Sequence, residues 1–232
     1  PYHPERSAGE VVLGTDDLSF GREFPLGKHI DLEFHAGEVT ALTGRNGVGK
    51  STLALTLAGL LEPLAGHVRM AERMVPPRRA NDVSTWKSRD LLGRVGMVFQ
   101  EPEHQFVTAS VRDEVAVGPK SMGKTDEEAY RIADEILERM NLKRFGPANP
   151  FTLSGGEKRR LSVASMMAAA PKVVVMDEPT FGQDFTTWTE MVRLIADVRD
   201  AGSAVIMVTH DEALIEALDA RRIVVSEEEQ HD

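Results

Sequence analysis

The sequence predicts an α/β fold in which a mostly parallel sheet is flanked by helices, with an N-terminal antiparallel β-subdomain and an inserted α-helical subdomain. A glycine-rich loop at 44–52 follows an apolar run and precedes a series of helix formers. From 156 to 225, helical segments alternate with continuously apolar strands, which is typical of a parallel sheet covered on both faces. A helical stretch at 110–140 separates two such strands, so we expect it to form the insertion.

The composition is that of a globular protein, and we expect one domain over 1–232, with the helical subdomain within about 100–170. Of the 232 residues, 41% are hydrophobic and 28% are charged. The absence of cysteine excludes disulfides and thiolate metal sites. The net charge of −10 disfavours non-specific binding to nucleic acid. Pro1 stands in place of methionine, which favours one piece of a longer or fused polypeptide.

No stretch of the sequence reaches the about twenty apolar residues that cross a bilayer. The best candidate, 163–176, is interrupted by Pro171 and Lys172. The first ten residues are polar and charged, unlike a signal peptide. We therefore expect any association with a membrane to go through a partner protein.

The first part of the chain is expected to be rich in strands. Residues 10–34 mix β-formers with glycine and proline, which predicts short antiparallel strands joined by turns. The apolar run 39–42 predicts a buried strand, and a helix follows the glycine-rich loop as far as about Leu60. Residues 69–89 are polar, and we expect them to be irregular.

The second part is expected to alternate between helices and strands. Thr125 and Glu128 have the spacing of a capping box, and apolar residues recur at helical spacing from Ala129 to Met140. The methionines on that face are expected to fill the core. The remaining strands are expected at 94–99, 172–176, 204–209 and 221–225, and the remaining helices at 156–170, 186–201 and 211–218.

The glycine-rich loop fits the phosphate-binding pattern G-x-x-x-x-G-K-[ST] in its expected strand–loop–helix context. Glycines let the backbone N–H groups approach phosphate oxygens, and the following helix adds the positive end of its dipole. We expect Lys50 to reach the β- and γ-phosphates of a nucleotide and the Ser51 hydroxyl to bind Mg²⁺. The expected nucleotide-binding residues of this loop are Gly44, Arg45, Asn46, Gly47, Val48, Gly49, Lys50, Ser51 and Thr52.

Two carboxylates, Asp177 and Glu178, follow the apolar run 173–176. Ligands of open α/β sheets bind at the carboxyl ends of strands. Because side chains alternate in direction along a strand, the two acids cannot share one role. We expect Asp177 to belong to the Mg²⁺ shell and Glu178 to polarise a water for attack on the γ-phosphate. The alternative is a pair of solvated acids that cap a strand.

The run Leu153-Ser154-Gly155-Gly156-Glu157 is the third motif, and with it the chain resembles the ATP-binding cassette (ABC) family of P-loop NTPases. Ser154 and Glu157 also have capping-box spacing, and a capped helix start with exposed N–H groups is an anion site. The resemblance implies that this site covers the γ-phosphate of ATP held by a second cassette. Glu157 stands where glutamine is most common, so we expect it to pair with a base such as Arg159 or to face its own helix backbone.

The resemblance implies further site residues. Gln100 matches the Q-loop glutamine, which would contact Mg²⁺ and the attacking water. His210 matches the switch histidine, which would bind the γ-phosphate and hold the water with Glu178. Asp184 matches an aspartate at the dimer interface, after Gln183 in place of the usual leucine. Lys50, Glu178 and His210 are thus the expected catalytic residues, and Ser51, Gln100 and Asp177 the expected metal ligands.

The adenine contact is where the chain departs from the family pattern. The aromatic residue that would stack on the base is expected near Arg22, in a segment that is shorter than usual. Phe24 could supply the ring, or Arg22 could stack by its guanidinium plane. The alternative for Phe24 is a packed core residue.

The segments 99–106 and 110–119 are similar to those of ATPase subunits of energy-coupling factor transporters, which take up vitamins, their precursors, or cobalt and nickel ions. The resemblance implies an ATPase that binds Mg²⁺ and ATP, dimerises with an identical or different cassette, and drives an integral membrane subunit at the cytoplasmic face of the cell membrane. The alternative is a soluble ABC ATPase acting on nucleic acid or ribosomes. The net charge, one cassette and the lack of heptads disfavour it.

Overall fold

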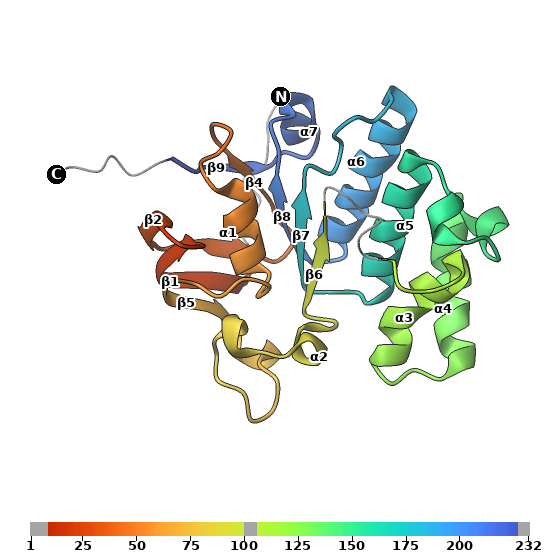
Figure 1. Cartoon of the computed structure of the whole chain (residues 1–232), viewed down its shortest axis with the longest axis horizontal. Helices are drawn as coiled ribbons and strands as arrows, with labels where there is room; N and C mark the ends of the chain where they lie inside the picture. The colour runs from red at the N-terminus through yellow and green to blue at the C-terminus, as the bar shows by residue number, and fades with distance from the viewer. Residues whose placement is uncertain (1–8, 100–105, 227–232) are drawn as a thin grey trace.

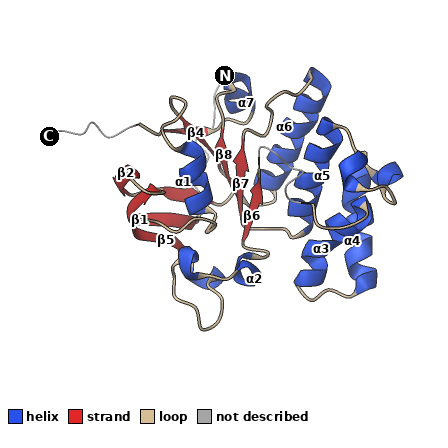
Figure 2. Ribbon diagram, viewed as in Figure 1, coloured by secondary structure: helices blue, strands red, loops and turns tan. Residues whose placement is uncertain are grey.

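The computed structural model describes residues 9–99 and 106–226, which form two sheets with helices packed around the larger one (Figure 1). Figure 2 shows both sheets on one side of the molecule and the largest group of helices on the other. The helices are α1 Lys50–Leu57, α2 Ser88–Leu91, α3 Val111–Ser121, α4 Asp126–Arg139, α5 Gly155–Ala168, α6 Phe185–Asp200 and α7 Glu212–Ala217. No helix in these two ranges has the length and apolar character to cross a membrane.

The larger sheet is parallel and has the strand order β6-β7-β8-β4-β9. Its strands are β4 Val39–Thr43, β6 Val95–Val98, β7 Val173–Asp177, β8 Ala204–Val208 and β9 Arg221–Val224. Each lies within about two residues of its predicted range. Side chains of β7 and β8 are almost wholly buried, as expected for central strands covered on both faces. Because the strands are parallel, the loops that follow β4, β7 and β8 leave from one edge.

The smaller sheet is antiparallel, as predicted for the N-terminal part. Its strands are β1 Val11–Gly21, β2 Pro25–Ile30, β3 Glu33–His35 and β5 Ala65–Met70. The expectation of irregular structure from residue 69 was wrong for the end of β5. Only Val68 and Met70 of this strand are buried, so its apolar alternation is too short to stand out, and pairing with β1 supplies the rest of its stability.

The helical subdomain follows β6 in the chain and precedes β7, its neighbour in the sheet, so the predicted insertion is confirmed (Figure 1). Helix α4 begins at the predicted capping box. The Glu128 N–H donates to Thr125 Oγ1 at 3.3 Å, and the Thr125 N–H donates to Glu128 Oε2 at 3.0 Å. Its apolar face is buried, as predicted.

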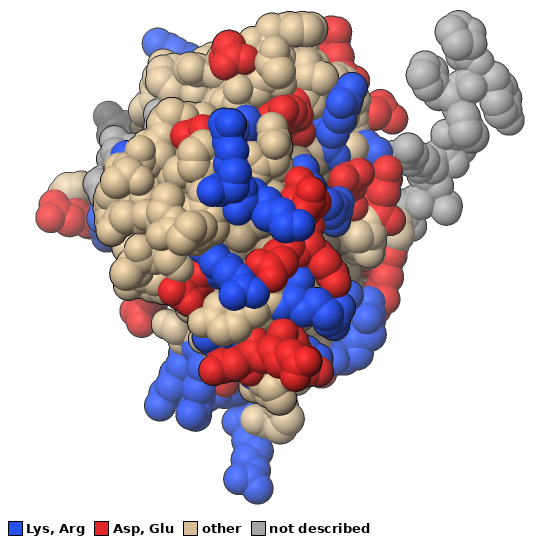
Figure 3. All heavy atoms as spheres, turned by 90° about the vertical axis from the view of Figure 1, so that its right-hand side faces the viewer, with Lys and Arg blue, Asp and Glu red and all other residues tan. Residues whose placement is uncertain are grey.

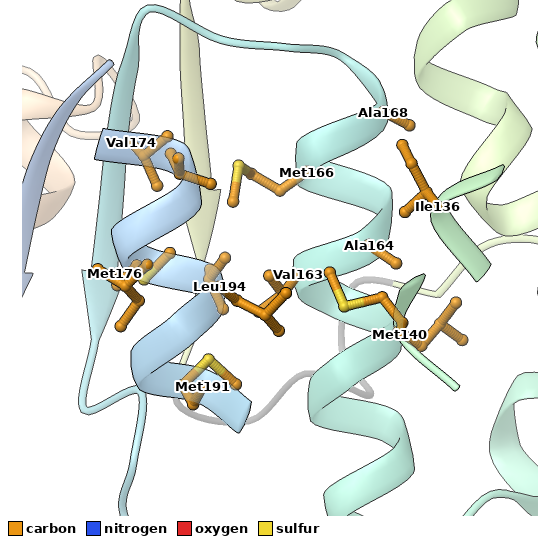
Figure 4. Packing of buried hydrophobic residues seen from close by; sticks show 14 of the residues in the cluster. Ile136, Met140, Val163, Ala164, Met166, Ala168, Val174, Met176, Met191 and Leu194 are labelled. Carbon is orange, nitrogen blue, oxygen red and sulfur yellow. The ribbon is translucent and has the colours of Figure 1, made fainter. Parts of the chain in front are cut away.

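Helix α5 packs between the parallel sheet and the helical subdomain. Figure 4 shows Val163 and Met166 directed toward the β7 and α6 side, and Ala164 and Ala168 directed toward α4. All four belong to one buried cluster with residues of β7, α4 and α6. Met140 fills this core as predicted, at 2% exposure, and Met176 and Met191 are fully buried in the same cluster. One helix therefore packs against both parts of the molecule.

Candidate active site

The glycine-rich loop leaves β4 and enters α1 with three glycines at positive φ. Gly44, Gly47 and Gly49 have φ values of 139°, 89° and 95°, which residues with a side chain rarely adopt. A Cβ atom at Gly44 would lie 2.2 Å from the carbonyl oxygen of Val225. At Gly47 a Cβ would meet nothing within 4 Å, so the tip of the loop is open. The loop can thus approach an anion closely with its backbone N–H groups.

Lys50 is the first residue of α1, and its side chain turns back over the loop. The residue is 9% exposed, and its Nζ donates to the carbonyl oxygens of Gly44 at 2.7 Å and Arg45 at 2.8 Å. Its ammonium is therefore held beside the open tip, where Arg45, Asn46 and Gly47 are exposed. A cation fixed next to free backbone donors is a good phosphate site.

Asp177 ends β7 with an incomplete set of partners. Its Oδ1 is buried and has no hydrogen-bond partner among residues 9–99 and 106–226. Burial raises the pKa of Asp177 above its ordinary value, although a hydrogen bond from Ser51 and the charge of Lys50 act against this. An orphaned buried carboxylate oxygen beside a hydroxyl fits a divalent cation such as Mg²⁺.

The described residues contain no cluster of three or more His, Asp or Glu side chains that could hold a metal by themselves. This fits Mg²⁺, which is commonly bound by one or two protein ligands together with substrate phosphates. Ser51 and Asp177 lie together as predicted, whereas Gln100 lies outside the described residues.

The burial of Asp177 has a consequence for stability. A carboxyl group with a higher pKa in the folded chain destabilises the fold above its folded pKa, and the penalty disappears below its unfolded pKa of about 3.9. Without Mg²⁺ and nucleotide, Asp177→Asn protein is expected to melt about 2–4 °C higher at pH 7. The gain should vanish near pH 3. Calorimetry checks this, and a lower Tm at pH 7 would show that the charge stabilises the fold.

Glu178 and His210 meet at the ends of neighbouring strands, β7 and β8. His210 Nδ1 lies 2.8 Å from Glu178 Oε1. The Glu178 side chain is 14% exposed, whereas that of His210 is 67% exposed, so the carboxylate is held inside and the imidazole faces outward. The ring of Phe181 packs edge-on against His210 with centroids 6.4 Å apart. The prediction that these two residues lie together agrees with this geometry, and their chemical roles remain predictions.

Asp211, directly after His210, accepts hydrogen bonds that tie three segments together. Its Oδ2 accepts from Thr180 Oγ1 at 2.9 Å and from Trp188 Nε1 at 2.7 Å. Its Oδ1 accepts from the N–H of Leu214, which caps α7. Sequence reasoning missed Thr180 and Trp188. Nothing local signals these contacts, because they join residues 31 and 23 positions apart.

The start of α5 has both hydrogen bonds of a capping box. Glu157 N–H donates to Ser154 Oγ at 3.4 Å, and Ser154 N–H donates to Glu157 Oε2 at 2.9 Å. The second bond holds the pKa of Glu157 below its ordinary value. Both alternatives for Glu157 are realised in part: it contacts its own helix backbone, and its Oε1 lies 4.0 Å from the guanidinium of Arg144, a base other than Arg159. Gly155 is exposed, so its backbone is accessible at this helix start.

Phe24 lies in the turn between β1 and β2 and is 76% exposed, which excludes the alternative of a core residue. The same hairpin touches the phosphate loop. A Cβ at Gly49 would lie 2.8 Å from Leu26 and 3.1 Å from Phe20. Phe24 and the exposed Arg22 therefore sit on a hairpin next to the loop, and the adenine contact remains a prediction for either.

The chain is similar to a known family, to known proteins and to solved structures. The sequence profile of a family described as ABC transporter matches residues 27–181, more than half of the chain. The chain is 43% identical over 185 residues to the energy-coupling factor transporter ATP-binding protein EcfA2 of Lactococcus lactis, covering 78% of this chain and 62% of that protein. It is 35% identical over 212 residues to EcfA of Methanosphaera stadtmanae, covering 88% and 72%.

A further relative is YkoD of Bacillus subtilis, which is named for HMP/thiamine import. It is 40% identical over 209 residues, which are 90% of this chain. The chain spans only 36% of YkoD and 62% of the Lactococcus lactis protein, less than two thirds of each.

Two solved structures are similar to the fold described above. The first is cbiO1 from Clostridium perfringens, part of the ABC transporter complex cbiONQ, with a TM-score of 0.75, 28% identity and coverage of 93% of this chain and 85% of that one. The second is the cassette MJ0796, a dimer bound to ADP and Pi, with a TM-score of 0.79 and 22% identity. It covers 92% of this chain and 94% of its own, and it supports the fold alone.

Proposed function

The chain belongs to the ABC transporter family of ATP-binding proteins, and from this premise we propose that it is an ATPase that powers a membrane transporter. The observation that carries the proposal is the Glu178–His210 pair, with 2.8 Å between carboxylate and imidazole, at the sheet edge that also bears the Lys50 loop. A base at this edge and a cation over a phosphate loop are what hydrolysis of a nucleoside triphosphate requires.

We assign one task to each side chain at this edge. The backbone of 44–49 and the Lys50 ammonium would bind the phosphates and neutralise charge that develops on the γ-phosphate. Glu178 would accept the proton of the attacking water, which His210 would help to hold. Ser51, Asp177 and Gln100 would hold Mg²⁺, which when bound neutralises charge on the β- and γ-phosphate oxygens.

We further propose that the site is completed by a second cassette, identical or different. The start of α5 would place Ser154, Gly155, Gly156 and Glu157 against the γ-phosphate of ATP bound to the partner. What supports this is the capped helix start, in which the pKa of Glu157 is lowered and Gly155 is exposed. Because Glu157 is bound to the Ser154 N–H at 2.9 Å, its charge is partly balanced beside the phosphate.

A site shared between two copies predicts a second-order dependence on protein concentration. In dilute solution, where few dimers exist, ATPase activity of the purified chain is expected to rise with the square of concentration. Phosphate release over a dilution series measures it. Activity proportional to concentration throughout the dilute range would contradict the shared site.

The transporter is proposed to be an importer of the energy-coupling factor type, for a vitamin, a vitamin precursor or a metal ion. The names of the relatives from Lactococcus lactis, Methanosphaera stadtmanae and Bacillus subtilis support this class. The chain would then bind an integral membrane subunit at the cytoplasmic face of the membrane. Co-purification with a hydrophobic membrane protein tests this, and co-purification with ribosomes or DNA would favour the alternative instead.

The surface charge supports a protein partner rather than a nucleic acid. On the face formed by the helical subdomain, basic and acidic side chains are interspersed (Figure 3). They pair as Arg112 with Asp134, Arg131 with Glu135, and Lys143 with Glu138. Because the charges are paired, this face offers no basic stripe for a phosphate backbone.

For the adenine of ATP we propose that Phe24 stacks on the base. Weaker ATP binding by Phe24→Ala protein would test this.

A further inference from the structure

Arg159 is a buried side chain that connects α5 to the backbone next to the proposed base. It lies in the second turn of α5, five residues after the capping Ser154, and is 7% exposed. Its Nη1 donates to the carbonyl oxygen of Glu178 at 2.9 Å and to that of Pro179 at 3.4 Å. The helix start proposed to serve the partner's nucleotide is thus linked to the base proposed to act on the chain's own nucleotide.

The backbone of Glu178 needs such a contact. Its φ of 47° lies in the left-handed region, which residues other than glycine adopt only where their surroundings hold them. Three hydrogen bonds hold it here. The Glu178 N–H donates to the carbonyl oxygen of Val208 at 2.9 Å, and the Glu178 carbonyl accepts from Arg159 at 2.9 Å and from the Phe181 N–H at 3.2 Å. Loss of the Arg159 bond would leave this carbonyl with only the longer bond, so the peptide could relax and carry the carboxylate away from His210.

The charge of Arg159 also acts on this carboxylate. Burial lowers the pKa of the guanidinium, and the charge of Glu178 opposes this shift. Arg159 remains a cation, because the pKa of arginine lies far above neutrality. A buried cation therefore lies beside Glu178 and also holds its backbone.

Helix α5 is suited to transmit a displacement to Arg159. Beyond Arg159 it is packed on both sides, by Val163 and Met166 toward β7 and α6 and by Ala164 toward α4 (Figure 4). Its capped start, in contrast, is exposed at Ser154 and Gly155. A ligand that binds to this helix start would therefore push on α5. The first buried side chain of that helix is Arg159, which contacts the backbone of Glu178.

We propose that Arg159 is a positioning residue that couples the two nucleotide sites of a dimer. When the start of α5 in one copy closes on the ATP of its partner, Arg159 fixes the Glu178 backbone of its own copy in the reactive conformation. Hydrolysis at each site then depends on ATP at the other. This inference rests on the proposed function, because it requires a dimer with shared sites.

The test compares Arg159→Met with Arg160→Met in steady-state ATPase measurements over a range of ATP concentrations. Arg160 is the matched control, since it lies on the same helix and pairs with Glu190 at 2.9 Å. Parent protein and Arg160→Met are expected to give sigmoidal curves with similar kcat. Arg159→Met is expected to give a hyperbolic curve with kcat about 10- to 100-fold lower, the loss typical of a hydrogen bond to a charged group.

Binding measurements separate this proposal from the proposed function. In a Glu178→Gln background, ATP affinity and ATP-driven dimerisation by gel filtration should be unchanged by Arg159→Met. If Arg159→Met matches Arg160→Met in kcat and curve shape, or if the parent curve is hyperbolic, the coupling role is overturned while the ATPase remains. A parent protein that neither dimerises nor hydrolyses ATP overturns both proposals.

A second variant guards against loss of the fold. Arg159→Lys keeps the cation but replaces the guanidinium fork by a single ammonium, which is not equivalent at such a site. If Arg159→Met lacks a cooperative melting transition, Arg159→Lys is measured in its place. A lower kcat and a less sigmoidal curve are expected. Parent-like kinetics in Arg159→Lys would overturn the role assigned to the fork.

Discussion

Glu178→Gln protein is expected to bind ATP with parent affinity and to hydrolyse it about 10²- to 10⁴-fold more slowly, the contribution typical of a general base. The amide keeps the shape of the carboxylate but cannot accept a proton from water. Because hydrolysis ends the ATP-bound state, the variant should also accumulate as an ATP-loaded dimer. Phosphate release and gel filtration with ATP and Mg²⁺ measure the two effects.

Glu212→Gln is the matched control for Glu178→Gln. Glu212 is an exposed residue in the first turn of α7 that pairs with Arg222, two residues beyond His210 in the chain. Its variant should turn over ATP at the parent rate. If Glu178→Gln did the same, the assignment of Glu178 as the base would be wrong, although the nucleotide site could stand.

Lys50→Ala protein is expected to lose ATP affinity by about 100-fold or more, because charge-assisted hydrogen bonds to phosphate are among the strongest in proteins. The Lys50 ammonium is already fixed by the carbonyls of Gly44 and Arg45, so little ordering is needed when phosphate binds. Isothermal titration calorimetry with ATP and Mg²⁺ measures the affinity, and kcat should fall as well.

Lys124→Ala is the control for Lys50→Ala, since Lys124 is exposed in the turn between α3 and α4. Its variant should bind ATP like the parent. A melting curve should accompany the measurement, because Lys50 also holds two loop carbonyls. If a folded Lys50→Ala protein bound and hydrolysed ATP at parent levels, the assignment of the loop as the phosphate-binding site would be wrong.

Most of the fold could be predicted because its determinants are local. The run 173–176 is apolar throughout, so a buried central strand was the natural interpretation, and Thr125 with Glu128 placed the start of α4 to the residue. Strand β5 was missed because only two of its residues are buried. Its existence depends on pairing with β1, about fifty residues earlier in the chain.

The candidate site likewise has residues that local sequence patterns predict and residues whose role depends on contacts with distant parts of the chain. Lys50 was predicted from the phosphate-loop pattern, Asp177 and Glu178 from the apolar run that they follow, and His210 from the resemblance to the ABC family. Arg159 was considered only as a partner of Glu157, and Trp188 was assigned no role. Their actual partners, Glu178 and Asp211, lie about twenty residues away along the chain, and no periodicity marks either contact. The exposure of Phe24 could not be predicted from the sequence either, because a phenylalanine in a turn between two strands can be buried in the core or exposed at the surface.

The contact of Trp188 with Asp211 places an intrinsic tryptophan fluorophore next to the candidate site. The chain has two tryptophans, and the indole of the other, Trp86, donates to the carbonyl oxygen of Ala80 in the part that follows β5. Trp188 instead binds the carboxylate that directly follows His210, and its ring stacks with Phe185 at 6.3 Å. Its fluorescence emission is therefore expected to respond to rearrangement around His210, and in a Trp86→Phe protein it would be the one tryptophan signal.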